Sequence, residues 1–148
     1  MKILGFIIFL IAALVYIWNG KDYFNKKEWR AFFIKFIFVL IGAFLLVLFL
    51  VGLLKVFPSI SKDSLRELTV VLPASFSTVL LLKFLVVMIN TLFSFIMRFH
   101  QRYNSPENYM KLSSLTNRFG PRLLLLVKCL TSFAGIIMFY GIWFGTTP

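Results

Sequence analysis

The chain is poor in the residues from which catalytic and metal sites are built. Its 148 residues include one cysteine, Cys129, one histidine, His100, and only five acidic residues. A single cysteine cannot form an intramolecular disulfide, and a lone histidine without neighbouring cysteines or acids does not make a zinc or haem site. We therefore predict no cofactor and no metal, and we do not expect an enzyme.

Acidic residues are absent from every long apolar run. All five lie in the polar stretches between the runs, namely Asp22, Glu28, Asp63, Glu67 and Glu107. Proton and cation carriers rely on carboxylates within the membrane, so this absence argues against a cation transporter. Cys129, by contrast, lies within the last apolar run, where we expect it to be a small buried hydrophobic residue.

Apolar sequence is what the chain has in abundance. It is 60% hydrophobic, against about 45–50% in an ordinary soluble domain, with four apolar runs at about 3–19, 31–57, 69–97 and 123–145. Runs of roughly 18 or more apolar residues indicate transmembrane helices. The first run ends in bulky residues without a small-residue cleavage motif, so we expect it to be retained. The sequence predicts one all-α, membrane-embedded domain over residues 1–148, a four-transmembrane-helix bundle.

Basic residues outnumber acidic ones by 16 to five, which gives a formal net charge of +11. In a soluble protein this would suggest nucleic acid, but here the charges flank spans, where they set topology and meet lipid headgroups. We expect membrane lipid as a partner and no nucleic acid. The basic residues are concentrated in the first and third polar joints: Lys21, Lys26, Lys27, Arg30, Arg98, Arg102, Lys111, Arg118 and Arg122.

These two joints lie on the same side if all four runs cross the membrane. They carry nine Lys and Arg residues, against three on the other side. The bias of positive charge toward the cytoplasm then predicts that both joints are cytoplasmic and that both termini lie outside, in a bacterial inner (plasma) membrane. We expect the third joint, 98–122, to be polar and to contain a break at Gly120-Pro121 before the fourth span. Pro73 is expected to kink or restart the third helix.

Lys83 is the most unusual residue of the spans, because it lies at the centre of the third run. A charge there costs about 2.5–3.5 kcal/mol on insertion scales. Asn90 and Ser94 share its helix face, and Arg98 lies near that face. Because no acid lies within a span, we expect Lys83 to lack an internal partner. Three explanations stay open: snorkelling to the outer headgroups, pairing with a partner or a second copy, or a role in ligand binding or transport.

Small residues in the fourth run predict a close contact between helices. Gly141 and Gly145 match the small-xxx-small pattern of packed transmembrane helices, and Gly135 precedes them in the same run. We expect the three glycines to pack within the bundle, with a partner helix as the alternative.

A small bundle without catalytic groups offers only its helix faces and loops to other molecules. We predict a non-catalytic protein that binds another membrane protein or a membrane-inserting toxin. In size and character the chain is similar to immunity proteins against pore-forming bacteriocins and to entry-exclusion proteins of conjugation, an analogy of kind. Two alternatives remain: a permanent accessory subunit of a secretion, transport or respiratory complex, and an oligomeric channel or transport protein built around the Lys83 stripe.

Overall fold

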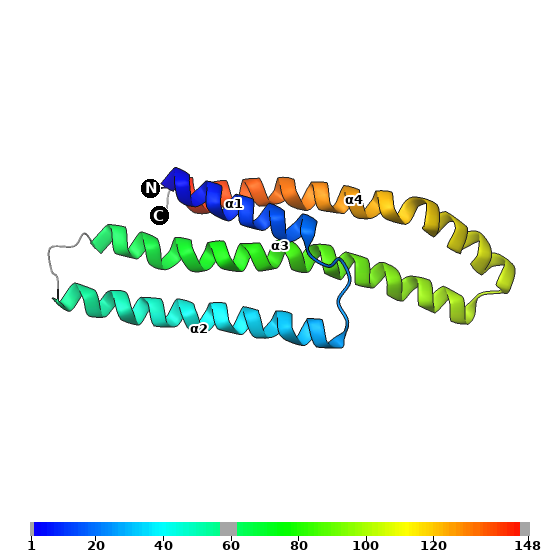
Figure 1. Cartoon of the computed structure of the whole chain (residues 1–148), viewed down its shortest axis with the longest axis horizontal. Helices are drawn as coiled ribbons and strands as arrows, with labels where there is room; N and C mark the ends of the chain where they lie inside the picture. The colour runs from blue at the N-terminus through cyan, green and yellow to red at the C-terminus, as the bar shows by residue number, and fades with distance from the viewer. Residues whose placement is uncertain (1, 57–61, 146–148) are drawn as a thin grey trace.

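The computed structural model describes residues 2–56 and 62–145, and the regular elements in these ranges are all α-helices. They are α1 (Lys2–Asn19), α2 (Lys26–Val56), α3 (Lys62–Tyr103) and α4 (Pro106–Phe144), shown in Figure 1. All four are long and apolar enough to cross a membrane. The predicted all-α four-helix bundle is confirmed, while residues 57–61 of the second joint lie outside the described residues.

The third joint is helical rather than a loop. The sequence predicts a polar connection over 98–122, but α3 continues to Tyr103 and α4 begins at Pro106, so only two residues remain between the helices. Ser105 has an extended backbone before Pro106, and proline's fixed φ and missing N–H suit the first helical position. The prediction of a polar connection between the helices is wrong, because residues 98–103 and 106–122, although rich in polar side chains, are part of α3 and α4.

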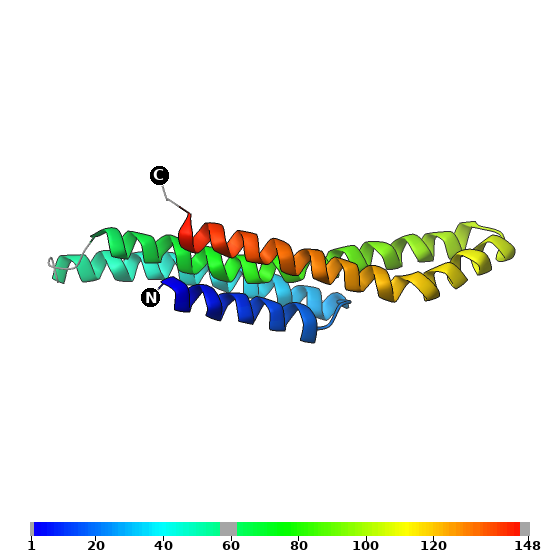
Figure 2. The same ribbon diagram turned by 90° about the horizontal axis from the view of Figure 1, so that it is seen from above.

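Neither internal proline ends its helix. Pro73 lies inside α3 and Pro121 lies inside α4, so the expected break at Gly120-Pro121 and a restart at Pro73 are wrong. A proline removes one backbone hydrogen bond and bends a helix. Figure 2 shows α4 bending where its colour passes from yellow to orange, the stretch of sequence that contains Pro121. Here the proline bends the helix without terminating it.

α3 is the central helix of the bundle. It packs against the three other helices, and α1 also packs against α4, whereas α2 packs only against α3 among the described helices. Figures 1 and 2 show α2 along one side of α3, with α1 and α4 on the other. This arrangement leaves a groove between α1 and α2 with α3 as its floor.

The largest buried cluster joins α1, α3 and α4. Within it, the indole N–H of Trp143 donates a hydrogen bond to the Ser75 hydroxyl at 3.1 Å. The ring of Phe9 lies 6.0 Å from Trp143 and 6.4 Å from Phe139. A Cβ atom at Gly5 would lie only 2.1 Å from the Trp143 ring. Gly5 therefore permits the close approach of α1 and α4, a role that the sequence pattern does not reveal.

Of the three glycines predicted to pack within the bundle, only Gly135 does so. A Cβ atom there would lie 2.9 Å from Leu82 of α3. A Cβ at Gly141 would meet no described atom within 4 Å, and Gly145 ends α4 with its N–H bonded to the Gly141 carbonyl at 3.0 Å. The prediction of internal packing through Gly141 and Gly145 is wrong, because the close helix contacts lie at Gly5 and Gly135.

Aromatic rings of α2 pack against an aromatic ring of α3 near the first joint. Trp29 and Phe32 of α2 lie 5.9 and 6.1 Å from the ring of Phe84 in α3. The start of α2 is held by a reciprocal pair of hydrogen bonds. The Asn25 side-chain oxygen accepts the Glu28 N–H at 2.9 Å, and the Glu28 carboxylate accepts the Asn25 N–H at 2.8 Å. This capping box sets the point at which the joint becomes helix.

Candidate functional site: a polar belt and a projecting arm

Asp22, in the first joint, lies between two lysines of the spans. Its carboxylate is 2.7 Å from Lys128 Nζ of α4 and 3.4 Å from Lys83 Nζ of α3. Lys83 is completely buried and also donates to the carbonyl of Ile17 at 3.4 Å, in the last turn of α1, where carbonyls lack helical partners. The expectation that Lys83 has no internal partner is wrong, because the joint folds back and carries an acid to it.

The predicted polar stripe of α3 holds the first joint in place. The Asn90 amide donates to the carbonyl of Asp22 at 2.9 Å, and Arg98 donates to the hydroxyl of Tyr23 at 3.2 Å. Ser94 is partly buried and, among the described residues, forms no hydrogen bond to this joint. The structure therefore joins three of the four stripe residues, Lys83 included, to the protein's own first joint.

Tyr16 and Trp18, at the end of α1, lie among these lysines. The Tyr16 ring is 5.9 Å from Lys83 Nζ and 5.8 Å from Lys35 Nζ. The Trp18 ring is 5.9 Å from Lys128 Nζ. Amphipathic rings and lysines with apolar stems are typical of the boundary between hydrocarbon and headgroups. We use the name polar belt for this set: Tyr16, Trp18, Asp22, Lys35, Lys83 and Lys128.

The polar belt lies about one hydrocarbon thickness from the opposite end of the bundle. Between Lys35 and Lys55 α2 rises about 30 Å, and between Lys62 and Lys83 α3 rises about 31 Å. A hydrocarbon core is about 30 Å thick. Lys83 lies beside the first joint, where it contacts Asp22 and the Ile17 carbonyl, and its snorkelling to the outer headgroups stays a prediction.

Past the belt, α3 and α4 continue as an antiparallel pair over residues 88–103 and 106–126, which we call the arm. By helix rise the arm is about 24 Å long, and Figures 1 and 2 show it extending beyond the ends of α1 and α2. Its seam includes a contact at 3.1 Å from the Thr116 hydroxyl to the Met97 sulfur. From Met88 to Leu126, however, no side chain is buried. The arm has a seam but no core of its own.

Each helix of the arm exposes an apolar stripe. Residues three or four positions apart share a helix face, and the exposed apolar residues follow this spacing. On α3 they are Ile89, Leu92, Phe95, Ile96, Phe99 and Tyr103, and on α4 they are Leu115, Phe119, Leu123 and Leu126, while Met110 and Leu125 are exposed outside this spacing. These two stripes are named the arm stripes below.

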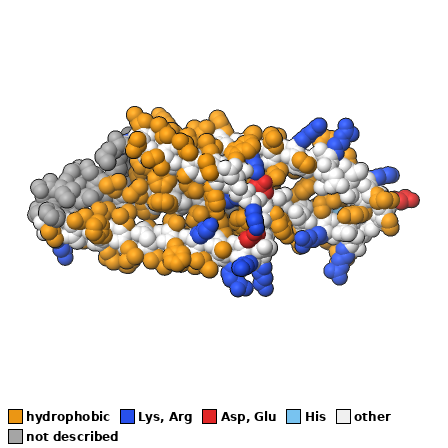
Figure 3. Space-filling model, viewed as in Figure 1, with side chains coloured by type: hydrophobic (Ala, Val, Ile, Leu, Met, Phe, Trp, Pro, Cys, Tyr) orange, Lys and Arg blue, Asp and Glu red, His pale blue; other side chains and the backbone are white. Residues whose placement is uncertain are grey.

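Positive charge accompanies the arm stripes. The arm has Glu107 as its single acid and five basic residues: Arg98, Arg102, Lys111, Arg118 and Arg122. Figure 3 shows Lys and Arg side chains gathered at this end of the molecule, with an acid at the tip and hydrophobic side chains over the rest of the bundle. That rest of the bundle, on the other side of the belt from the arm, is called the membrane part below. The arm therefore presents apolar surface bordered by cations.

The basic residues of the first joint lie at the same end as the arm. They are Lys21, Lys26, Lys27 and Arg30. Lys21 forms an ion pair with Glu28. The hydrogen bond that Lys21 donates to the Glu28 carboxylate, together with the bond from the Asn25 backbone N–H, holds the pKa of the Glu28 carboxyl below its ordinary value. The two joints predicted to share one side therefore do lie at one end of the bundle.

Sequence patterns do not single out Asp22 or Lys128 as partners of Lys83. The sequence did contain a signal for an ion cluster, because Lys83 and Lys128 each lie inside an apolar run, where a charged side chain needs a counter-charge. Asp22 is the acid closest to the end of the first run. Choosing it required knowing that α3 and α4 both pass beside the first joint.

The described residues hold no group of three or more His, Cys, Asp or Glu side chains placed to bind a metal. Cys129, expected to be buried, is exposed on α4. The belt is a cluster of paired charges and aromatic rings, and the arm exposes apolar side chains. Compared with protein-family models, curated proteins and solved structures, the chain shows no significant match to any of them.

Proposed function

We propose that the chain is a non-catalytic membrane protein that binds another protein through its arm. The observation that carries this proposal is the arm itself, which exposes two apolar stripes beyond the polar belt and buries no side chain between Met88 and Leu126. Water does not cover apolar surface without cost, about 25 cal/mol for each Å². An exposed apolar patch of this kind marks an interaction site.

The shape and charge of the arm favour an amphipathic helix of the partner. Two antiparallel helices with adjacent apolar stripes form a surface on which a third helix can pack, as in helix-in-groove recognition. The basic residues beside the stripes favour a partner helix with acidic flanks. They also oppose self-association of two arms, because both would carry positive charge.

The partner that fits this proposal is another membrane protein or a membrane-inserting toxin. The chain would then act as an inhibitor of the immunity or exclusion type, anchored by its bundle in a bacterial inner membrane. The excess of Lys and Arg in the first joint and the arm supports a cytoplasmic location for both. Binding on that side would bring the arm to cytoplasmic segments of the partner.

A permanent accessory subunit is the second candidate, and one observation favours it. Contact between the exposed apolar side chains of the arm and water costs free energy. A long-lived complex with a secretion, transport or respiratory assembly would cover these side chains at all times. The two candidates differ in whether the partner stays bound through purification. An oligomeric channel around Lys83 has less support, because the first joint occupies Lys83, Asn90 and Arg98.

Photo-crosslinking in the native membrane tests the proposal. A photoreactive amino acid replaces Phe95, which is 68% exposed on the arm, and in the control it replaces Phe44, which is 64% exposed on α2. We expect discrete protein adducts from position 95 and lipid adducts from position 44. Mass spectrometry of the adduct identifies the partner. If position 95 yields only lipid adducts, the arm lies in the membrane and the proposed function fails.

A further inference from the structure

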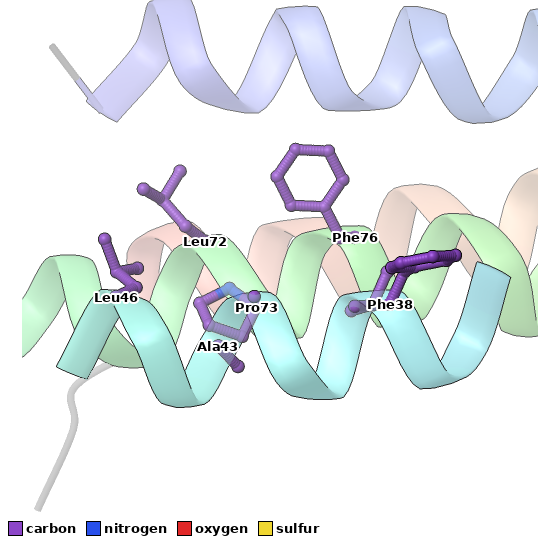
Figure 4. Close-up of a pocket in the computed structure, with 8 residues that line it drawn as sticks. Phe38, Ala43, Leu46, Leu72, Pro73 and Phe76 are labelled. Atoms are coloured by element: carbon purple, nitrogen blue, oxygen red, sulfur yellow. The ribbon is translucent and has the colours of Figure 1, made fainter. Parts of the chain in front are cut away.

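Two apolar cavities lie along α2 and α3. The first, of about 410 Å³, lies between Gly42 of α2 and Pro73 and Phe76 of α3. Figure 4 shows Phe76 pointing from α3 into the space below α1. The second, of about 570 Å³, is bounded by α1, α2 and α3 and reaches Tyr16 and Lys35. Along one face of α3, Pro73 and Phe76 line the first cavity, Leu80 lines the second, and Lys83 of the belt lines a third cavity described below.

The belt end of this groove is positively charged. A third cavity, of about 170 Å³, shares Tyr16 and Lys35 with the second and is also lined by Lys21, Lys83 and Glu28. Asp22 and Glu28 are the two acids here. The four lysines are Lys21, Lys35, Lys83 and Lys128, so two positive charges remain uncompensated.

Lys35 is the lysine left available to a ligand. Its side chain is exposed on α2, and among the described residues it contacts the Tyr16 ring and no carboxylate. Lys83 and Lys128 both contact Asp22, and Lys21 contacts Glu28. An anion at the groove end would therefore meet Lys35 first, beside the aromatic ring and the headgroup boundary.

We propose that this groove is a binding site for one anionic phospholipid of the leaflet on the belt side. An acyl chain lies along the two apolar cavities, and the phosphate lies beside Lys35 and Tyr16. The two cavities measure about 410 and 570 Å³, each within the usual range for ligand sites of roughly 300–1,000 Å³. The charge of the groove end selects an anionic headgroup over a zwitterionic one. This site is separate from the arm and does not depend on the proposed function.

An apolar transmembrane helix in this groove would leave Lys35 and the positive groove end without a counter-charge. A second copy of the chain would also bring its own lysines to an end that is already positive. A flexible acyl chain with one negative headgroup matches both the volume and the charge of the groove.

Native mass spectrometry of the full chain tests the proposal. The protein is released from nanodiscs that contain equal amounts of phosphatidylglycerol and phosphatidylcholine, and the retained lipids are counted. We expect one phosphatidylglycerol retained in preference to phosphatidylcholine. Lys35→Ala lowers that retention about fivefold, the effect of one lysine near an anionic headgroup. Lys55→Ala, at the opposite end of α2, is the matched control and leaves it unchanged.

A second variant tests the apolar part of the site. A Cβ at Gly42 meets no described atom within 4 Å, so Gly42→Leu projects into the first cavity without displacing the helices, and we expect it to reduce lipid retention. The proposal is overturned if both lipids are retained equally, if Lys35→Ala behaves like Lys55→Ala, or if Gly42→Leu changes nothing. Retention of a second protein chain in place of lipid also overturns it.

Discussion

The membrane part and the arm expose phenylalanine side chains to the same degree, but only the membrane part is expected to have lipid that covers these side chains. Phe44 in α2 is 64% exposed and Phe95 in the arm is 68% exposed. Lipid tails are as apolar as the Phe44 ring, so its exposure costs little. Phe95 lies beyond the polar belt, and on the proposed function it faces water, where its exposure favours a protein partner. The exposed fraction identifies a binding surface only when the surrounding solvent is known.

The two regions also differ in what holds them together. The membrane part has a buried cluster that includes Phe139 and Trp143, and it has a buried lysine with its counter-ion. The arm has no buried side chain between Met88 and Leu126. Regions with few buried contacts open at low free-energy cost. We therefore expect partner binding to stabilise the arm far more than the bundle.

Water access is expected to separate the two regions most clearly. In a Cys129→Ser background, Gln101→Cys on the arm should react with a membrane-impermeant maleimide, because thiolates form in water, whereas Phe44→Cys should not react. Labelling in inside-out vesicles but not in intact cells would place the arm in the cytoplasm. If Gln101→Cys reacts only after detergent is added, the arm lies within the bilayer and the comparison breaks down.

The next largest effect is expected at the polar belt. Asp22→Asn removes the carboxylate between Lys83 and Lys128 and leaves a buried ammonium unpaired, which typically costs about 3 kcal/mol. Unfolding of the purified protein by SDS in mixed micelles measures the loss. The control is Glu107→Gln at the tip of the arm, which we expect to be neutral. Equal stability of the two variants would show that Asp22 does not hold the bundle.

A smaller loss is expected from close packing in the membrane part. Gly5→Ala places a methyl group against the ring of Trp143, and such overpacking costs about 2 kcal/mol. Gly42→Ala adds the same methyl group where the structure leaves open space, so its unfolding curve should match that of the unmodified protein. A neutral Gly5→Ala would mean that α1 and α4 are farther apart than described.

The smallest effect is expected for a single hydrogen bond. Ser75→Ala leaves the indole N–H of Trp143 without its acceptor, at a cost of about 1 kcal/mol in the free energy of unfolding. Ser94→Ala in the arm removes a hydroxyl that forms no hydrogen bond to the first joint, and SDS titration should show no change. If the two serine variants behave alike, the bond from Trp143 to Ser75 contributes nothing measurable to stability.

For the arm, sequence patterns predict the secondary structure but not whether its exposed side chains face lipid or water. Its apolar residues, from Leu92 to Tyr103, already follow helical spacing, so its helicity was open to prediction. The apolar sequence continues on both sides of Lys83, so hydropathy along the chain did not show where the polar belt lies. Composition cannot separate a lipid-facing helix from a water-facing one that binds a partner, since both expose leucine and phenylalanine.

The sequence by itself determined the four membrane-spanning helices and the excess of positive charge on one side. Each feature depends on adding up a property of individual residues. The transfer of a helix into lipid depends on the hydrophobicity of its own side chains, and orientation depends on the number of Lys and Arg residues beside it. Tertiary structure alone decided that Asp22 pairs with Lys83 and Lys128, that Gly5 rather than Gly141 makes a close contact, and that α3 lies at the centre. These are contacts between residues far apart along the chain, and each depends on how neighbouring helices are placed.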